Sequence, residues 1–169
     1  MLATLMAVDI IPQDSGGSPG GGDTGTVIAT PARTVVLAVV QASSMVADGI
    51  PLGASTWSQQ FDPSDHAPFA IDFTALLDTG EKIVEMEAIT MSAAGALLGI
   101  SVDDTTGYSP IIDTGGKKVQ LWFVVDSGHW SDTSFAGAGV QVPVSVRIAT
   151  DGTPAKRFER TCVLIVRQL

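Results

Sequence analysis

The residue types of a serine hydrolase triad occur close together in this chain. Asp126, Ser127 and His129 fall within four positions. A triad is assembled from separate elements of a fold, whereas residues one or two positions apart in a near-extended chain point away from one another. We therefore interpret this segment as a polar loop. A hydrolase would require the fold to bring Ser127 and His129 together with an acid from another strand.

Two acidic segments contain residue types that could bind a metal ion. Asp62 and Asp65 precede His66, and Asp103 and Asp104 precede a Thr-Thr-Gly turn. Calcium takes roughly six to eight oxygen ligands, more than either segment offers. Asx turns account for the same residues without a metal. The sequence therefore predicts no metal site.

Other signatures of catalysis or cofactor binding are incomplete. Gly137 and Gly139 lack the third glycine and the following helix of a dinucleotide site. Cys162 is the single cysteine, which excludes an internal disulfide and a cysteine-based zinc site, and its place in an alternating strand favours a buried, inert thiol. Glu85 and Glu87 would share a solvated strand face rather than act as an acid–base pair. We predict no enzymatic activity and no cofactor.

The charge and the hydropathy of the chain argue against nucleic-acid and membrane partners. Eighteen acidic residues against nine basic residues give a formal net charge of -9, whereas nucleic-acid-binding proteins present a basic face. The longest purely apolar run, residues 35–40, is far too short to span a bilayer. The first residues lack the basic segment of a signal peptide. We expect a protein that is made and assembled in a cytoplasm.

Candidate residues must be positioned by β-strands, because helical patterning is scarce. Hydrophobic residues form 45% of the chain, with 18 glycines and 9 prolines, which is typical of an all-β protein with many turns. Apolar and polar positions alternate between turn signals rich in Asp, Thr and Gly. The spacing predicts an antiparallel β-sandwich with strands near 69–74, 82–92, 96–102, 108–112, 117–126, 139–149 and 157–168.

The strand pattern is clearest at the C-terminus. Val142 and Val144 belong to one apolar stripe, and Cys162 and Leu164 belong to another in the next strand. The two strands are predicted to form a long hairpin. Pro143 has no N–H to donate to a ladder, so its strand is expected at a sheet edge or with a bulge.

The first third of the chain divides into an arm and the beginning of the sandwich. The apolar run at 34–41 predicts a strand that is buried on both faces, or covered by the sheet on one face and by a partner on the other. Small residues at 42–56 predict a connecting loop. We expect an N-terminal extended arm with a Gly/Ser/Pro-rich linker over 1–33 and a β-sandwich domain over 34–169.

The arm has the composition of an apolar tip on a flexible tether. Residues 1–12 are mostly apolar, and six of the thirteen positions at 13–25 are glycine. A coil of that length has a typical reach of about 20 Å. Such an arm could bind a neighbouring subunit, and a frayed terminus is the equal alternative. The predicted contact residues are Leu2, Leu5, Met6, Val8 and Ile10.

Aromatic residues supply two further contact predictions. Trp122 lies inside an apolar run and is predicted to belong to the core. Trp130, in a Ser/Gly/Asp loop, and Phe135 nearby are predicted as partner contacts. An exposed Trp130 would suit a protein interface and a sugar-stacking platform equally well.

Short motifs follow one another through the rest of the chain. Trp57 is followed by Phe61-Asp62-Pro63, by Ile71-Asp72-Phe73, by Gly80-Glu81-Lys82-Ile83 and finally by Arg157-Phe158-Glu159-Arg160. Over residues 57–169 this order resembles small Ig-like β-sandwich proteins of tailed-phage particles, in particular fibre-tail adaptors. Ser134–Gly137 replaces the glycine-rich turn and tyrosine of those proteins, and the first 54 residues are not part of the pattern.

The resemblance implies an Ig-like sandwich that acts through its surfaces and has no catalytic or cofactor residues. It implies a structural protein of the virion, assembled in the host cytoplasm, with other virion proteins (tail, fibre or capsid subunits) as partners and a homo-oligomer in the particle. The first function expected is that of a fibre-tail adaptor. A capsid decoration or cement protein is the alternative, and a carbohydrate-binding or adhesive module is the alternative from another class.

Overall fold

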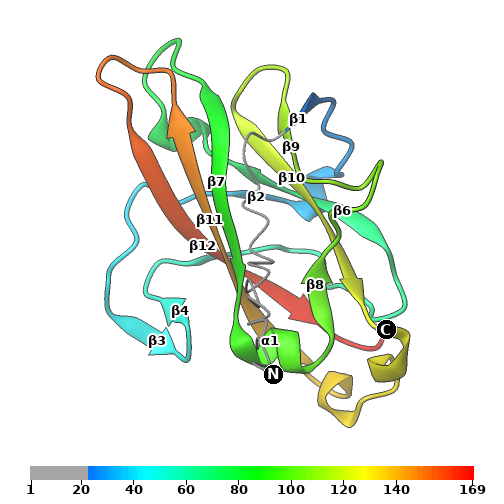
Figure 1. Ribbon diagram of the computed structural model, residues 1–169. Helices are drawn as coiled ribbons and strands as arrows, with labels where there is room; N and C mark the ends of the chain where they lie inside the picture. Colours follow the sequence, from blue (N-terminus) through cyan, green and yellow to red (C-terminus); the bar gives the residue numbers. More distant parts are fainter. Residues whose placement is uncertain (1–22) are drawn as a thin grey trace, which may run out of the picture.

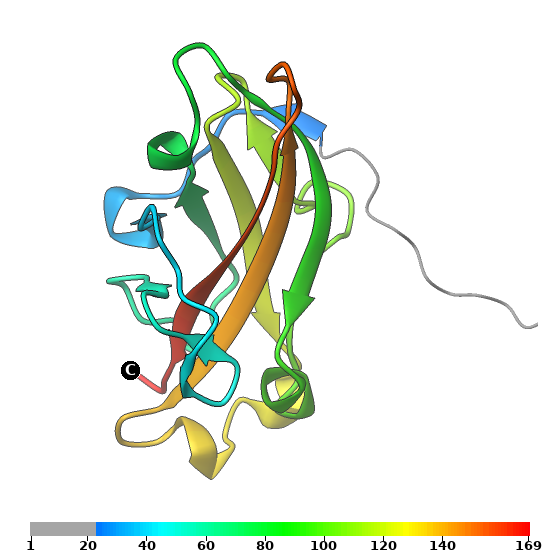
Figure 2. The ribbon, with the colours of Figure 1, turned by 90° about the vertical axis from the view of Figure 1, so that its left-hand side faces the viewer.

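The computed structural model describes residues 23–169, which form a mainly β protein (Figure 1). Two larger sheets lie face to face with the hydrophobic core between them, and a small hairpin lies at one side (Figure 2). In this part of the chain one short α-helix, α1 (Ala93–Leu97), and four 3-10 helices, η1 (Pro31–Arg33), η2 (Thr74–Leu76), η3 (Ser127–His129) and η4 (Thr133–Phe135), connect the strands.

The strands belong to three sheets. In the first, the order is β1 (Asp23–Gly25), β9 (Ile111–Asp113), β10 (Lys118–Val125), β6 (Ala67–Asp72) and β2 (Thr34–Val36), and β8 (Ile100–Val102) also pairs with β10. In the second, the order is β5 (Ser55–Thr56), β12 (Arg157–Val166), β11 (Val140–Thr150) and β7 (Ile83–Met91). The hairpin consists of β3 (Met45–Ala47) and β4 (Ile50–Pro51).

β11 and β12 form the long C-terminal hairpin that the alternation predicts. Val144 lies opposite Cys162 in the antiparallel register, and both side chains are fully buried. Leu164 and Val166 continue the inward face of β12 and are also fully buried. The period of two places these side chains between the sheets.

Of the two alternatives predicted for the strand that contains Pro143, a sheet edge is wrong and an irregular, bulge-like register is observed, although not at Pro143 itself. β11 is an inner strand between β12 and β7, so the prediction of an edge strand is wrong. The last β7 pair joins Met91 to Val144, and Pro143 lies beyond it, where no ladder bond to β7 is needed. The β11–β7 register does shift, between Arg147 and Ile148 and again after Ala149.

Three short pairs depart from the predicted antiparallel arrangement. β1 pairs parallel with β9, β2 with β6 and β5 with β12. Each involves only two or three residues per strand and extends a sheet built from longer antiparallel pairs. The antiparallel prediction is therefore correct for the long strands and wrong for these edges, because alternation determines which face a residue occupies and not the direction of its neighbour.

The folded body begins before the predicted domain boundary. Residues 23–33, which the sequence assigned to the arm, contain β1 and η1. Between these elements the backbone N–H groups of Ile28 and Ala29 donate to Oε1 of the buried Gln120, at 2.7 and 3.0 Å. Residues 27–29 thus form an irregular segment that is anchored by the Gln120 side chain.

The break between the strands predicted at 82–92 and 96–102 is the start of α1. The Oγ of Ser92 accepts a hydrogen bond from the N–H of Gly95 at 3.2 Å, as an N-cap does. A Cβ at Gly95 would lie 2.7 Å from Cγ1 of Val142, so glycine permits the close approach of the helix to β11. The strand predicted at 96–102 is shortened to β8.

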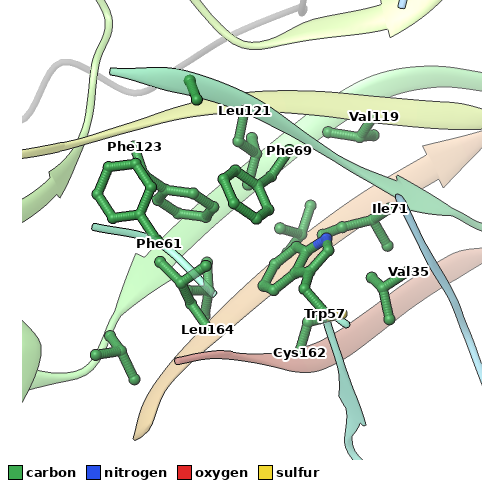
Figure 3. Packing of buried hydrophobic residues seen from close by; sticks show 14 of the residues in the cluster. Val35, Trp57, Phe61, Phe69, Ile71, Val119, Leu121, Phe123, Cys162 and Leu164 are labelled. Carbon is green, nitrogen blue, oxygen red and sulfur yellow. The ribbon is translucent and has the colours of Figure 1, made fainter. Parts of the chain in front are cut away.

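Four aromatic rings form the centre of the core (Figure 3). Trp57, Phe61, Phe69 and Phe123 are each no more than 1% exposed and meet edge to face, with ring centroids 5.5–6.3 Å apart. The indole N–H of Trp57 donates to the carbonyl of Ala70 at 2.8 Å, so its polar atom is satisfied inside the protein.

Candidate interaction surface

The Ser and His of the hydrolase-like segment are not assembled into a triad. Ser127 and His129 lie in η3, and in the described part of the chain no hydrogen bond joins their side chains. Nδ1 of His129 is 4.0 Å from the Asp132 carboxylate. The pKa of Asp132 is lowered, chiefly because Ser134 donates from its backbone N–H, with His129 a smaller cause. The Asp132 carboxylate therefore acts as the N-cap of η4.

The two acidic segments meet through His66. Its Nε2 lies 3.0 Å from Oδ2 of Asp103, while Asp62 accepts instead from Ser64 and from the backbone N–H of Leu169. Those bonds, first the one from the Ser64 hydroxyl, lower the pKa of Asp62. Within residues 23–169 no three His, Cys, Asp or Glu side chains are grouped to hold a metal ion.

Trp122 lies on the outside of the first sheet, so its predicted place in the core is wrong. Leu121 and Phe123 point inward and are fully buried, and alternation turns the intervening Trp122 outward. Its ring centroid lies 5.0 Å from that of Tyr108 and 5.2 Å from that of His66. The period of two within the apolar run was the signal that could have identified this outer aromatic cluster.

A polar network closes one end of the molecule. The side chain of Glu81 is 3% exposed and accepts from the Thr150 hydroxyl at 2.6 Å, the Asp78 N–H at 2.8 Å and the Lys156 ammonium at 3.0 Å. These bonds, the one from Thr150 first, lower the pKa of Glu81 to about 2. Contacts with Asp78 and Glu81 raise the pKa of Lys156. Each charge has a partner within the chain, so this network has a structural explanation.

The predicted loop contacts divide into one exposed and one buried residue. The side chain of Trp130 is 44% exposed, and its indole N–H donates to the carbonyl of Val125 at 2.8 Å. Phe135 is fully buried, so the prediction of a surface contact there is wrong, because η4 turns its ring into the core. The predicted arm contacts at Leu2, Leu5, Met6, Val8 and Ile10 lie outside the described residues.

The apolar run at 34–41 behaves differently from the buried strand that was predicted. β2 ends at Val36, and only Val35 and Leu37 point into the core. Val36 is 63%, Val39 59% and Val40 75% exposed. Burial on both faces is therefore wrong for this segment. The other interpretation, that a partner covers the outer face, stays a prediction.

The segment 42–56 continues the exposed apolar character. It was predicted as a loop but contains β3, β4 and β5. We name the exposed side chains of this region the apolar edge surface, and each of its members is more than half exposed: Val36, Val39, Val40, Met45, Val46 and Leu52. These six are half of the large hydrophobic side chains exposed in the described chain, so their concentration within seventeen positions is not the ordinary scatter of single apolar residues.

Hydrogen bonds to β12 hold the apolar edge surface in place. The Gln41 side chain donates to the carbonyl of Thr161 at 2.6 Å and accepts from the Thr161 N–H at 3.0 Å. The Arg160 guanidinium donates to the carbonyl of Val39 at 3.0 Å. Within the surface, the N–H of Ala42 donates to the carbonyl of Leu52 at 2.9 Å. The surface is therefore preformed, which lowers the entropy cost of binding to it.

Comparisons with protein-family models, with curated proteins and with solved structures give no match to this chain. A search of the helices in residues 23–169 finds none with the length and apolar character needed to cross a membrane. Function is therefore inferred from the surfaces of the molecule.

Proposed function

We propose that this chain is a non-enzymatic structural protein of a tailed-phage particle, with a fibre-tail adaptor as the first choice and a capsid decoration protein as the alternative. The observation that carries the proposal is the apolar edge surface. Large apolar side chains that are exposed within one short segment beside a sheet edge are typical of a contact with another protein. Other virion subunits and further copies of the chain are its partners.

An Ig-like sandwich is the form we propose for the fold. Two facing sheets, a long C-terminal hairpin and a buried tryptophan, Trp57, support this description. The motifs at Phe61-Asp62-Pro63 and Ile71-Asp72-Phe73 also have structural functions here. The Asp62 carboxylate binds the N–H of Leu169, and Ile71 and Phe73 are fully buried. The shared motifs thus maintain the scaffold, and the exposed surfaces determine the partner.

The composition of purified particles tests this proposal. Quantitative mass spectrometry of gradient-purified particles is expected to detect the chain in a fixed ratio to the major capsid protein, and electron microscopy of labelled particles gives its position. Labels at the tail, with fibres attached, fit an adaptor, whereas labels spread over the shell fit a decoration protein. Absence of the chain from the particle would contradict both.

A carbohydrate-binding or adhesive module is the second candidate, favoured by the outer aromatic cluster. Tyr108 is 39% exposed and packs against Trp122 and His66, and an exposed aromatic ring is the type of group on which a sugar stacks. Binding to a glycan array by the purified protein, lost in Tyr108→Ala, would support this function. An array without signal would remove it.

A further inference from the structure

The apolar edge surface and the first described strand lie at opposite edges of the molecule. β2, where the surface begins, is one edge of the first sheet, and β1 is the other. The β3–β4 hairpin likewise lies on the far side of the ribbon from β1 in Figures 1 and 2. The 22 residues that precede Asp23 therefore enter the fold at the edge that is remote from the surface.

The chemistry of the first residues complements that surface. Nine of residues 1–11 are apolar, and Asp9 is the one charged side chain among them. Arg160, which borders the surface through its bond to the Val39 carbonyl, forms no ion pair with any carboxylate of residues 23–169. Asp48, in the turn between β3 and β4, is the one charged residue within 36–52. An apolar segment with a single carboxylate could cover the surface and pair with Arg160.

We propose that residues 1–11 of one copy bind the apolar edge surface of a second copy, with Asp9 facing Arg160. This inference rests on the proposed function in assembly, and it specifies which parts of two neighbouring copies touch. Two features support the proposal: a preformed apolar surface at one edge of the molecule, and an apolar terminal segment that is attached at the opposite edge.

The edge at which the arm is attached, more than the length of its linker, favours binding to a neighbour. From β1 to β2 the first sheet spans four strand spacings, about 19 Å in total, and the surface lies beyond β2. A Gly-rich coil of ten residues, the number at 13–22, has a typical end-to-end distance of about 16–19 Å. To reach its own surface, the chain would have to cross the whole sheet, whereas a second copy placed edge to edge brings a surface to the β1 side.

Such a contact is heterologous, because the arm and its receiving surface are different parts of the chain. Repetition of the contact joins copies head to tail, and the assembly forms a ring if the rotation closes. Rings and regular arrays are the arrangements a repeated virion component requires, and many weak arm contacts would sum through multivalency.

Crosslinking between two variants of the full-length chain tests the contact. One population carries Leu5→Cys and the other carries Val46→Cys, and they are mixed with a short bismaleimide reagent. The native Cys162 is a suitable silent background, because it is fully buried and burial raises its pKa to about 12. The matched control replaces Val46→Cys with Val84→Cys, on β7, where the side chain is 54% exposed.

The expected result is a crosslinked dimer in the Leu5→Cys and Val46→Cys mixture, in a yield roughly tenfold above the Val84→Cys control, because docking raises the local thiol concentration. Equal yields with Val46→Cys and Val84→Cys would overturn the proposal, as would no dimer with either. A chain that carries both Leu5→Cys and Val46→Cys and crosslinks only within itself would also overturn it, in favour of binding within one copy.

The proposed pairing of Asp9 with Arg160 is tested by separate variants. Asp9→Asn or Arg160→Gln is expected to reduce dimer yield several-fold, and the double variant is expected to lose no more than either single one. Independent, additive losses would remove the Asp9–Arg160 pairing from the proposal. All of these measurements use purified protein, so they can succeed when the chain is absent from particles, or fail when it is present there. The two proposals are therefore separable.

Discussion

Two apolar regions of this molecule differ in what covers them. The rings of Trp57, Phe69 and Phe123 are enclosed between two sheets, and the one polar atom of the tryptophan ring is hydrogen-bonded. In the apolar edge surface, Val40 is 75% exposed although its neighbour Leu37 is 3% exposed. The first region stabilises the fold. The second contributes little to folding, and we propose that its apolar character serves association.

The largest expected effect is in the enclosed region. Phe123→Ala removes a fully buried ring and leaves a cavity, which is expected to lower the free energy of unfolding by about 3–5 kcal/mol. Val36→Ala, at a 63% exposed position, is the matched control and is expected to change it by no more than about 0.5 kcal/mol. Urea denaturation measures both. Similar losses in the two variants would abolish the distinction between the regions.

The polar network gives a smaller effect that depends on pH. The folded pKa of Glu81, about 2, lies below the ordinary 4.5, so the unfolded chain binds the proton more tightly. The stabilisation by the Glu81 carboxylate is therefore fully present above about pH 4.5 and is lost as the pH falls towards 2. We expect Glu81→Gln to be less stable than the parent at pH 7 and to show a shallower loss of stability between these pH values. Parallel pH profiles in urea denaturation would show that Glu81 is not the group responsible.

An exposed ion pair is expected to contribute less. The Arg147 guanidinium lies 2.6 Å from the Glu159 carboxylate, and both side chains are about half exposed. Solvent screens such a pair, so a double-mutant cycle with Arg147→Ala and Glu159→Ala is expected to give a coupling of about 0.2–1 kcal/mol. The coupling should fall further in 1 M salt. A larger, salt-independent value would mean that this pair is shielded from solvent, for example by a partner.

The smallest effect on stability is expected at the apolar edge surface. Val40→Ser with Val46→Ser should change the free energy of unfolding by no more than about 0.5 kcal/mol, because both positions are exposed in the folded chain. The same variant should reduce self-association, measured as the mass of the full-length protein in sedimentation equilibrium. Loss of stability with association unchanged would assign the surface to the fold instead.

The elements that the sequence predicted best are those with strict alternation. In β11 and β12 the inward positions, such as Val144 and Cys162, are fully buried, and the predicted hairpin is confirmed. Alternation is a local property of the strand, so it can be read from neighbouring residues. Strand direction at the sheet edges is not local, and this is why the parallel pairs of β1, β2 and β5 were not foreseen.

Two predictions that rested on unbroken apolar runs are wrong. Trp122 was assigned to the core because its neighbours are apolar, yet it faces outward between the buried Leu121 and Phe123. The run at 34–41 was assigned to a buried strand, yet its second half leaves the sheet after Val36. The period of two separates Trp122 from Leu121 and Phe123, but an unbroken apolar run does not show which of its two faces is covered.

The candidate surface could be predicted only in part. Trp130 is exposed as expected, whereas Phe135 is enclosed by the core, because the two residues differ in how η3 and η4 orient them. The hydrogen bonds that hold the apolar edge surface, such as those between Gln41 and Thr161, join positions 120 apart in sequence. Contacts between residues so far apart in sequence form only in the complete fold, so they could not be predicted from local patterns.

The proposal that residues 36–52 form an assembly contact is tested most directly by what surrounds them in a purified particle. A cryo-electron microscopy map that resolves side chains would show what lies against Val40, Met45 and Val46. We predict that a neighbouring subunit covers these side chains in every copy of the chain. A map in which the chain is present and residues 36–52 face solvent would contradict the assignment of this surface to assembly.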